Sequence, residues 1–313
     1  MPNTRSLLVA VTSTLALLSL PSLAKADTYV NVNFPGPADV ATLDGRVYLP
    51  DPMPEDPPAV IMVHGCGGMW SDDTPANGGV REIERWGREL AAQGYVALAV
   101  DSYSTRTPPG VSVAAYQDQC SGKTYAGAVD PYTKRVDDIA AARAFLIDAY
   151  AIDSDGGLGL LGWSQGAQAV LIAMAATPRD SNVASSSPSP YAAAVAYYPG
   201  CGTLLGYGMT ISTNLAGYWR PAAPMRMHMG TSDSFWGNCD RRADNAIDNY
   251  SADLTWVEFT GAKHNFDNTG TTAFPTAACT STEWATSGMK DQCAMREADL
   301  DSLDFVLAEV VSG

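Results

Sequence analysis

The sequence predicts an α/β fold, in which a mostly parallel central sheet is covered by helices on both faces. The chain has 313 residues, of which 46% are hydrophobic and 17% charged, so it holds enough apolar material for one large domain. Short apolar runs alternate along it with segments of helical periodicity, which is typical of parallel strands joined by helices. Neither an internal repeat nor a change of composition divides the chain, so we expect a single domain.

Apolar runs of strand length mark the predicted buried strands, and apolar residues three or four apart mark the predicted helices. Clusters of proline and serine indicate loops at residues 51–58 and 181–190. In such sheets the functional side chains gather at the carboxyl ends of the strands, which constrains every candidate residue. The predicted strands are residues 59–63, 95–100, 158–161, 192–198, 225–229 and 254–259, and the predicted helices are residues 80–90, 136–146, 167–176 and 300–310.

The first 26 residues have the pattern of a secretory signal peptide. Arg5 supplies a positive charge, residues 7–20 form an apolar stretch, and Ala24-Lys25-Ala26 fits a cleavage site. The apolar stretch is short for a membrane span and is interrupted by Ser and Thr. We predict cleavage after Ala26 and export to the periplasm or the medium, with an uncleaved anchor as the alternative. The mature chain, residues 27–313, is then expected to have no membrane span.

The formal net charge of the whole chain is −15 at pH 7. Removal of the predicted signal peptide takes away Arg5 and Lys25 and no acidic residue, which changes the net charge to −17. A surface this acidic repels nucleic acids and anionic membranes, so we expect neither as a partner. The charge does not identify a substrate.

An even number of cysteines in an exported chain predicts disulfides. Six cysteines allow 15 complete pairings, and Cys279 and Cys293 are the easiest pair to propose because they bracket one short segment. The chain has no C-x-x-C pair and no H-E-x-x-H motif, so we expect neither a metal nor another cofactor. The six are Cys66, Cys120, Cys201, Cys239, Cys279 and Cys293.

The pattern G-x-S-x-G occurs once as a candidate catalytic motif, at residues 162–166, with Ser164 at its centre. The pattern alone is weak evidence, because a chain rich in Gly and Ser can contain it by chance. Its context is stronger, since it follows a predicted strand and precedes an apolar predicted helix, as a nucleophile elbow requires. We therefore predict that Ser164 is a nucleophile, and a helix-capping serine is the alternative.

A serine hydroxyl needs a general base, and the chain has only three histidines. His64 precedes the serine, which is too early for the order Ser, Asp, His that such folds use. His228 lies inside a predicted strand and is more consistent with packing. His264 follows the predicted strand 254–259 on a loop at a carboxyl end, so we predict that it is the base.

The base needs a carboxylate that orients the ring and stabilises the imidazolium. Asp233 follows the predicted strand 225–229 at once and reaches the same edge of the sheet. Asp240 is the rival, and an aspartate that only caps a turn is the alternative for either. An oxyanion hole needs two backbone N–H groups. We expect one N–H donor from Gln165 and the other from Gly65 or Cys66. The sequence does not decide which of these two residues is the donor.

The chain contains four segments whose order resembles that in the dienelactone hydrolase family of the α/β-hydrolase superfamily. These segments are H-G-C-G-G at residues 64–68, G-W-S-Q-G at 162–166, G-T-S-D at 230–233 and K-H-N-F at 263–266. The resemblance extends over about residues 60–311. It implies an α/β-hydrolase fold with Ser164, Asp233 and His264 as nucleophile, orienting acid and base.

Two departures from the family pattern bear on the substrate. The founding enzymes carry a cysteine at the elbow, where this chain has Ser164, and a glutamate in the oxyanion loop, where it reads His64-Gly65-Cys66. The resemblance therefore implies hydrolysis of an ester or lactone rather than of a dienelactone in particular. It also favours the disulfides Cys66–Cys120 and Cys201–Cys239, which leaves Cys279–Cys293, and a bridged Cys66 could not be a rival nucleophile.

Candidate substrate contacts are less specific. By resemblance, Arg106 holds the place of an arginine that binds a substrate carboxylate, with a structural salt bridge as the alternative. Trp163 and Trp236 flank the predicted nucleophile and acid and are candidates for the wall of an acyl pocket, unless they belong to the core. Residues 201–221 are long for a connection and are a candidate small cap over the site, with a packed excursion as the alternative.

The sequence thus predicts an exported serine hydrolase that cleaves carboxylic esters or lactones through an acyl-enzyme intermediate. The substrate is expected to be a small molecule or a polymer. The first alternative is a secreted depolymerase or esterase that acts on polyester or acylated polysaccharide, and peptidase activity ranks below it. A binding protein that has the hydrolase fold without turnover is the remaining alternative.

Overall fold

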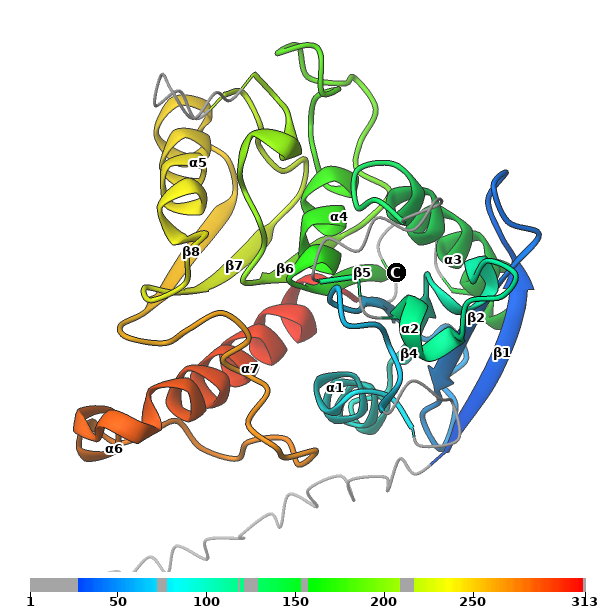
Figure 1. Ribbon diagram of the computed structural model, residues 1–313, viewed down its shortest axis with the longest axis horizontal. Coiled ribbons are helices and arrows are strands. Elements are labelled where there is room, and N and C mark those ends of the chain that lie inside the picture. The colour runs from blue at the N-terminus through cyan, green and yellow to red at the C-terminus, as the bar shows by residue number, and fades with distance from the viewer. Residues whose placement is uncertain are drawn as a thin grey trace, which may run out of the picture.

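An eight-stranded sheet forms the centre of the molecule, with strands in the order β1-β2-β4-β3-β5-β6-β7-β8 (Figure 1). The computed structural model describes residues 28–71, 78–117, 119–120, 129–152, 157–208 and 217–311, so the predicted signal peptide lies outside the described residues. Strands β3 to β8 are parallel, and β1 and β2 are antiparallel to their neighbours. The strands are β1 (Tyr29–Pro35), β2 (Thr42–Tyr48), β3 (Ala59–Val63), β4 (Val96–Asp101), β5 (Leu158–Trp163), β6 (Ala193–Tyr197), β7 (Met225–Gly230) and β8 (Leu254–Phe259).

The six predicted strands are confirmed as β3 to β8. Strands β3 to β6 are buried throughout, whereas β7 and β8 also carry polar residues and β8 is partly exposed. Strands β1 and β2 were not predicted. β1 is mostly exposed and carries polar residues at the edge of the sheet, so it has no apolar run that would identify it. The two strands extend the parallel sheet by an antiparallel pair, and the protein has the α/β-hydrolase fold.

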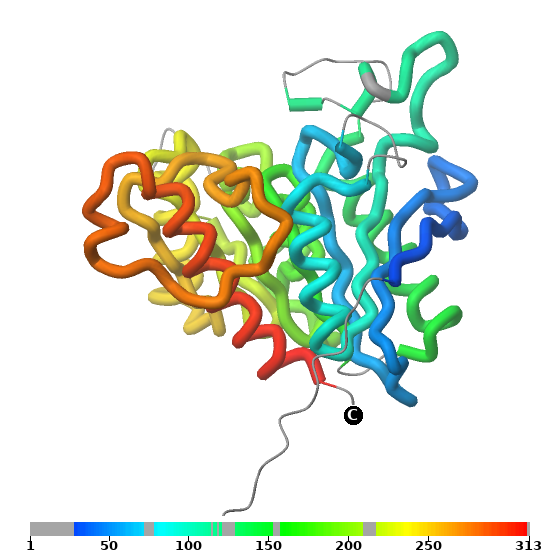
Figure 2. Tube along the Cα trace, turned by 90° about the horizontal axis from the view of Figure 1, so that it is seen from below, coloured from blue at the N-terminus to red at the C-terminus, as the bar shows by residue number. Residues whose placement is uncertain are grey.

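Helices cover both faces of the sheet, as predicted. Helices α1 and α7 lie together on one face of the sheet, and α3, α4 and α5 lie on the other (Figure 1). The face with α1 and α7 is turned toward the viewer in Figure 2. Helix α5 was missed, because most of its residues are polar and only a narrow stripe around Cys239 and Ala243 is buried. The helices are α1 (Arg81–Ala92), α2 (Val113–Gln117), α3 (Lys134–Tyr150), α4 (Gln165–Ala173), α5 (Trp236–Tyr250), α6 (Ser281–Ala285) and α7 (Lys290–Glu309), with short 3₁₀ turns at Ser104–Arg106, Thr203–Leu205 and Ser287–Met289.

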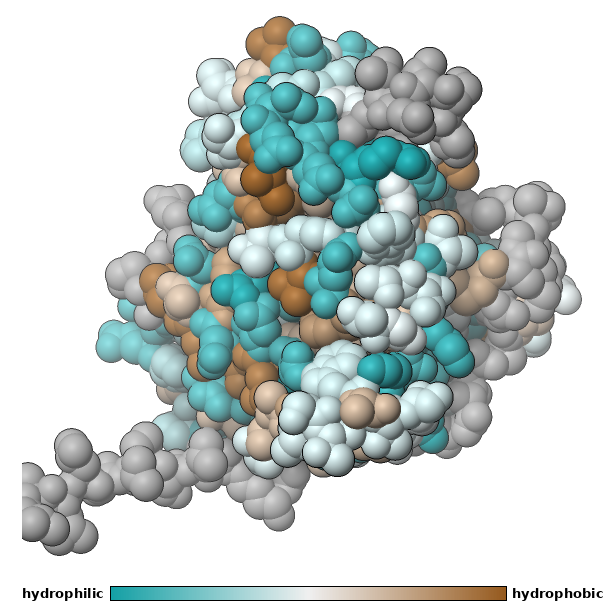
Figure 3. All heavy atoms as spheres, turned by 90° about the vertical axis from the view of Figure 1, so that its left-hand side faces the viewer, coloured by the Kyte–Doolittle hydropathy of each residue, from teal (hydrophilic) through white to brown (hydrophobic). Residues whose placement is uncertain are grey.

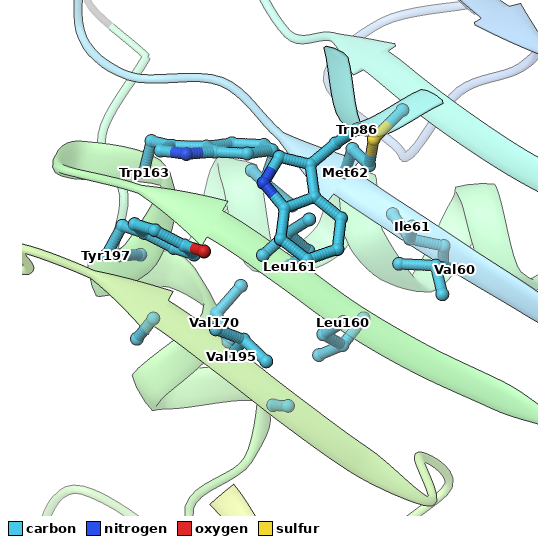
Figure 4. Packing of buried hydrophobic residues seen from close by; sticks show 14 of the residues in the cluster. Val60, Ile61, Met62, Trp86, Leu160, Leu161, Trp163, Val170, Val195 and Tyr197 are labelled. Atoms are coloured by element: carbon cyan, nitrogen blue, oxygen red, sulfur yellow. The ribbon is translucent and has the colours of Figure 1, made fainter. Parts of the chain in front are cut away.

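The central strands are buried on both sides, so the core is continuous through the sheet. Trp86 of α1, Trp163 of β5 and Tyr197 of β6 lie close together in this core (Figure 4). The ring centroids of Trp163 and Tyr197 are 5.9 Å apart, and those of Trp86 and Tyr197 are 6.4 Å apart. This aromatic group packs helix α1 against the strands that lead into the candidate site.

A buried ion-pair network lies beside the aromatic group. Arg85 of α1 contacts Asp299 of α7 at 2.6 Å and Asp267 at 3.3 Å, and all three side chains are fully buried. Asp299 also accepts hydrogen bonds from Trp86 at 3.2 Å and from the Tyr197 hydroxyl at 3.0 Å. Buried charges are stable only when they are paired and hydrogen-bonded in this way. The network fixes the loop that carries Asp267 to helices at opposite ends of the sequence.

Three disulfides are present, Cys66–Cys120, Cys201–Cys239 and Cys279–Cys293, as the family resemblance implied. Helices of the described residues are all too short or too polar to cross a membrane. On the side of the molecule that carries α5 and β8, hydrophobic atoms form only small patches among hydrophilic ones (Figure 3). We therefore expect that side of the protein to face solvent.

Candidate active site

Ser164 lies at a sharp turn between a strand and a helix. Strand β5 ends at Trp163 and helix α4 begins at Gln165, so Ser164 alone joins them. Its backbone has φ 50° and ψ −114°, which residues with a side chain rarely adopt. The turn also requires Gly166, because a Cβ atom there would lie 2.1 Å from the carbonyl oxygen of Val63. The strand–turn–helix setting predicted for this motif is present.

The three predicted catalytic side chains lie in one hydrogen-bonded row. The Oγ atom of Ser164 is 2.9 Å from Nε2 of His264, and Nδ1 of His264 is 2.6 Å from Oδ2 of Asp233. Asp233 follows β7 and His264 follows β8, so both lie at carboxyl ends of strands, as the fold class predicts. A carboxylate at Nδ1 keeps the proton on that nitrogen and leaves Nε2 free to accept one.

The row is buried at one end and open at the other. The carboxyl of Asp233 is fully buried, and its second oxygen accepts a hydrogen bond from the Phe235 N–H at 2.9 Å. The side chain of His264 is 34% exposed. Solvent and ligands therefore reach the imidazole and Ser164 while the aspartate stays inside the protein.

Aromatic rings pack against His264 from two residues. The ring centroid of Tyr198 is 4.9 Å away and that of Phe235 is 5.5 Å away, both edge to face. The Tyr198 hydroxyl donates a hydrogen bond to Asp267, three residues after His264 in the same loop, and Nε1 of Trp163 donates to Asp267 at 2.9 Å. These contacts hold the imidazole and its loop against the core.

A cavity of about 450 Å³ opens beside Ser164 and His264. The glycine-rich segment after β3 and the Cys66–Cys120 disulfide form part of its lining, and the first turn of α1 and two asparagines form another part. The described residues that line it are Gly65, Cys66, Gly67, Gly68, Ser71, Val80, Arg81, Glu82, Cys120, Ser164, His264, Asn265 and Asn268.

His64 is buried behind the glycine-rich segment and orients it. The Ser102 N–H donates to Nε2 of His64 at 3.3 Å, so the ring proton is on Nδ1, which donates to the carbonyl oxygen of Gly65 at 2.6 Å. Burial holds the pKa of His64 well below its usual range, so the ring is neutral. Because C=O and N–H point in opposite directions in a trans peptide, the N–H of Cys66 points away from the His64 ring.

Arg135 of α3 connects this segment to the elbow. Its Nη2 donates to the carbonyl oxygen of His64 at 2.6 Å, and its Nη1 donates to Oε1 of Gln165 at 3.3 Å. The Tyr103 hydroxyl donates to the same oxygen of Gln165 at 2.6 Å. The two segments predicted to supply oxyanion-hole donors are thus held by one buried guanidinium.

The predicted substrate contacts lie elsewhere in the structure. Arg106 pairs with Asp39 at 2.8 Å and with Asp138 at 2.7 Å, the contacts of a structural salt bridge. Trp163 is 1% exposed and belongs to the core (Figure 4), and Nε1 of Trp236 donates to Glu258. None of the three is among the described residues that line the cavity.

The described parts of the candidate cap pack onto the core. Nε1 of Trp219 donates to the carbonyl oxygen of Leu171 in α4 at 2.8 Å, and Pro221 forms a β-bridge with Ala175. Cys201 is joined to Cys239 of α5. Residues 209–216 of this segment lie outside the described residues, so a cap over the site stays a prediction.

The rival residues His228 and Asp240 lie outside the hydrogen-bonded row. His228 is fully buried in β7 with Nε2 2.8 Å from Oγ of Ser302. Asp240 lies on α5, where burial and the nearby Asp244 and Glu258 raise its pKa. The described residues contain no cluster of three His, Cys, Asp or Glu side chains that could hold a metal ion.

Sequence reasoning missed several residues that support the site. Arg135 had a signal, because it directly precedes the predicted helix 136–146 and lies four residues before the buried Ile139, on the same face. A charged residue on such a face indicates a buried polar contact. Tyr198, Asp267 and Glu82 had none, because their contacts join segments far apart in the sequence.

A family comparison agrees with this geometry. The model described as the dienelactone hydrolase family matches residues 43–292, which is most of the chain and includes Ser164, Asp233 and His264. The chain belongs to the dienelactone hydrolase family. A search of curated protein sequences finds no match to this family member.

Solved structures similar to this dienelactone hydrolase family member share its fold at low sequence identity. A puromycin-hydrolyzing peptidase of Mycobacterium tuberculosis has a TM-score of 0.58 and 17% identity over 94% of this chain, which spans only 41% of that protein. Esterase 2 of Thermogutta terrifontis, phosphoramylated by tabun, has a TM-score of 0.56 and 16% identity, covering 92% of this chain and 96% of its own. A dienelactone hydrolase-like promiscuous phosphotriesterase from metagenomic libraries has a TM-score of 0.56 and 16% identity, covering 90% and 98%.

Proposed function

We propose that this family member is an exported serine hydrolase of carboxylic esters or lactones. The observation that carries the proposal is the row Ser164–His264–Asp233, with its two hydrogen bonds of 2.9 and 2.6 Å. Ser164 attacks the carbonyl carbon while Nε2 of His264 accepts the hydroxyl proton. Asp233 keeps the imidazole in the required tautomer and stabilises its charged form.

The negative charge that develops on the carbonyl oxygen needs two N–H donors. We assign them to Gln165 and Cys66. The Cys66 donor is favoured over Gly65 because the Gly65 carbonyl is directed at His64, which leaves the Cys66 N–H facing the opposite way. His264 then gives its proton to the leaving alcohol. In the second step, water attacks the acyl-enzyme and releases the acyl group from Ser164.

Cavity lining and disulfides support two further parts of the proposal. Phe, Tyr and Trp are absent from the described residues that line the cavity, and its volume of about 450 Å³ suits a small ester better than a polymer. Three disulfides suit an oxidising compartment and support export. Bridging of Cys66 to Cys120 leaves no thiol at the cavity to compete with Ser164.

The test is labelling with a fluorophosphonate probe together with turnover of p-nitrophenyl butyrate. We expect wild-type protein to be labelled on Ser164, and Ser164→Ala to lose labelling and about 10⁴- to 10⁶-fold in turnover. Ser232→Ala is the matched control, because Ser232 is exposed beside Asp233 and outside the hydrogen-bonded row. A folded Ser164→Ala protein that still hydrolyses the ester would exclude the proposal.

A further inference from the structure

Glu82 occupies an unusual place beside the candidate active site. It lies in the first turn of α1, is half-buried, and lines the same cavity as Ser164 and His264. Within the described parts of the chain, no hydrogen bond or ion pair from another side chain reaches its carboxyl. A carboxyl that is partly withdrawn from water and has no side-chain partner is available to a ligand in the cavity.

Burial and nearby charges set the protonation of Glu82. Burial, together with the charge of Asp267, raises the pKa of Glu82 to about 7. Arg85 and Arg81 act in the opposite direction with smaller effect. A carboxyl in this condition carries a proton part of the time near neutral pH, so it donates as well as accepts hydrogen bonds.

Two amides line the same cavity as Glu82, and we call Glu82, Asn265 and Asn268 together the polar wall. Asn265 and Asn268 line the cavity and lie within four residues of His264 on the same loop. The Oδ1 atom of Asn265 is 3.2 Å from the Tyr198 hydroxyl oxygen, so the amide lies next to a ring that packs against His264. Together with Glu82, these groups offer both donors and acceptors.

The position of the wall indicates which part of an ester it faces. Nε2 of His264 gives its proton to the leaving alcohol, so the alcohol departs on the side of that nitrogen. Asn265 and Asn268 belong to the loop of His264, and Glu82 lines the same cavity as these two residues and His264. The polar wall therefore borders the alcohol side rather than the oxyanion side, which the glycine-rich segment forms.

We propose that Glu82, with Asn265 and Asn268, binds hydroxyl groups on the alcohol part of the substrate. The preferred substrates are then esters of polyhydroxylated alcohols, such as glycerol or a sugar. This inference rests on ester hydrolysis at Ser164. An alcohol that carries a carboxylate is disfavoured whenever Glu82 is ionised, because the two charges repel each other. Arg81 offsets this little, because it is exposed and solvent screens its charge.

The experiment compares three butyrate esters: propyl butyrate, glycerol 1-monobutyrate and the butyric ester of glycolate. Wild-type protein is expected to hydrolyse the glycerol ester with a kcat/KM at least about tenfold above that of the propyl ester. One or two additional hydrogen bonds contribute enough free energy for a ratio of this size. The glycolate ester is expected to rank last. Glu82→Leu should reduce the ratio of glycerol to propyl ester by about fivefold or more, mainly through KM.

Two variants separate binding from structure. Glu82→Gln keeps hydrogen bonding but removes the charge, so it should raise the ratio of glycolate to propyl ester by about fivefold. Glu89→Gln is the matched control on the same helix, where Glu89 bonds Gln93 one turn further on, and it should leave all ratios unchanged. A merely structural role of Glu82 would lower all three rates together and leave their ratios as they were.

The outcomes distinguish the two proposals. If wild-type protein hydrolyses the esters but shows no preference for the glycerol ester, or if Glu82→Leu keeps that preference, the inference about Glu82 is wrong and Ser164 chemistry stands. If none of the three esters is hydrolysed, or if Ser164→Ala hydrolyses them all, both proposals are wrong.

Discussion

Removal of the Cys66–Cys120 disulfide should affect turnover as well as stability. Cys66 lines the cavity and carries the proposed oxyanion-hole N–H, and its carbonyl oxygen accepts a hydrogen bond from Gln119 at 2.9 Å, next to Cys120. The disulfide is thus the main covalent support of the glycine-rich segment. The perturbation is the double variant Cys66→Ala with Cys120→Ala, which cannot form mixed disulfides.

The expected stability loss follows from the length of chain that the bond closes. The two cysteines are 54 residues apart, for which loop-closure entropy gives about 4 kcal/mol at 25 °C. Cys279 and Cys293 are 14 residues apart, for which the same relation gives about 3 kcal/mol. The double variant Cys279→Ala with Cys293→Ala is therefore a matched control. It removes a disulfide that makes a similar contribution to stability and lies outside the described cavity lining.

The effect on catalysis separates the two variants. A loosened oxyanion-hole donor is expected to lower kcat by about 10- to 100-fold, somewhat less than its complete loss. The assay is ester turnover at a temperature where near-ultraviolet circular dichroism shows both variants folded, with urea unfolding for the stability change. Equal kcat values for the two variants would refute the reasoning that this disulfide positions the donor.

Two other predictions concern the elbow and a buried histidine. Gly166→Ala should lower the free energy of unfolding by more than about 3 kcal/mol, because the new Cβ atom would lie 2.1 Å from the carbonyl oxygen of Val63. The control Gly237→Ala should change it by less than about 1 kcal/mol, because the space around Gly237 is open. Equal melting temperatures of the two variants would contradict this prediction. Burial lowers the pKa of His228 from 6.5 to about 4, so its neutral form stabilises the fold fully above pH 6.5 and this stabilisation is lost as the pH falls through 4. Relative to His228→Gln, wild-type protein should lose about 3 kcal/mol between pH 7 and pH 4 in urea unfolding, and a constant difference would contradict the assignment.

The parallel part of the fold could be predicted from the sequence because its signal is local. Strands such as Ala59–Val63 are apolar throughout, since both of their faces are buried, and the following helices carry apolar residues at helical spacing. Strand Tyr29–Pro35 and helix Trp236–Tyr250 escaped prediction for the opposite reason. Each buries only a few side chains, and the rest of each segment is polar like a loop.

The placement of Ser164, Asp233 and His264 could be predicted because each follows a recognisable strand, and strand ends meet at one edge of a parallel sheet. The cavity lining could not. Glu82 faces the site from a helix more than 80 residues earlier in the sequence, and Trp163 turns inward although it adjoins Ser164, because successive strand residues point to opposite faces. Those details depend on packing between distant segments.

The contact of Arg85 with Asp299 has a consequence for the order in which the protein becomes complete. Asp299 lies in α7, close to the end of the chain, while Arg85 and Trp86 lie in its first third. During synthesis, Arg85 and Trp86 are therefore made long before their shared acceptor exists, and the loop of His264 and Asp267 lacks its final support until α7 has been added. A polypeptide that ends before α7 keeps every residue of the row Ser164–His264–Asp233 and the contacts of Asp267 with Trp163 and Tyr198. Arg85 then lacks its contact with Asp299, so we expect the loop of His264 to be held less firmly until α7 is present.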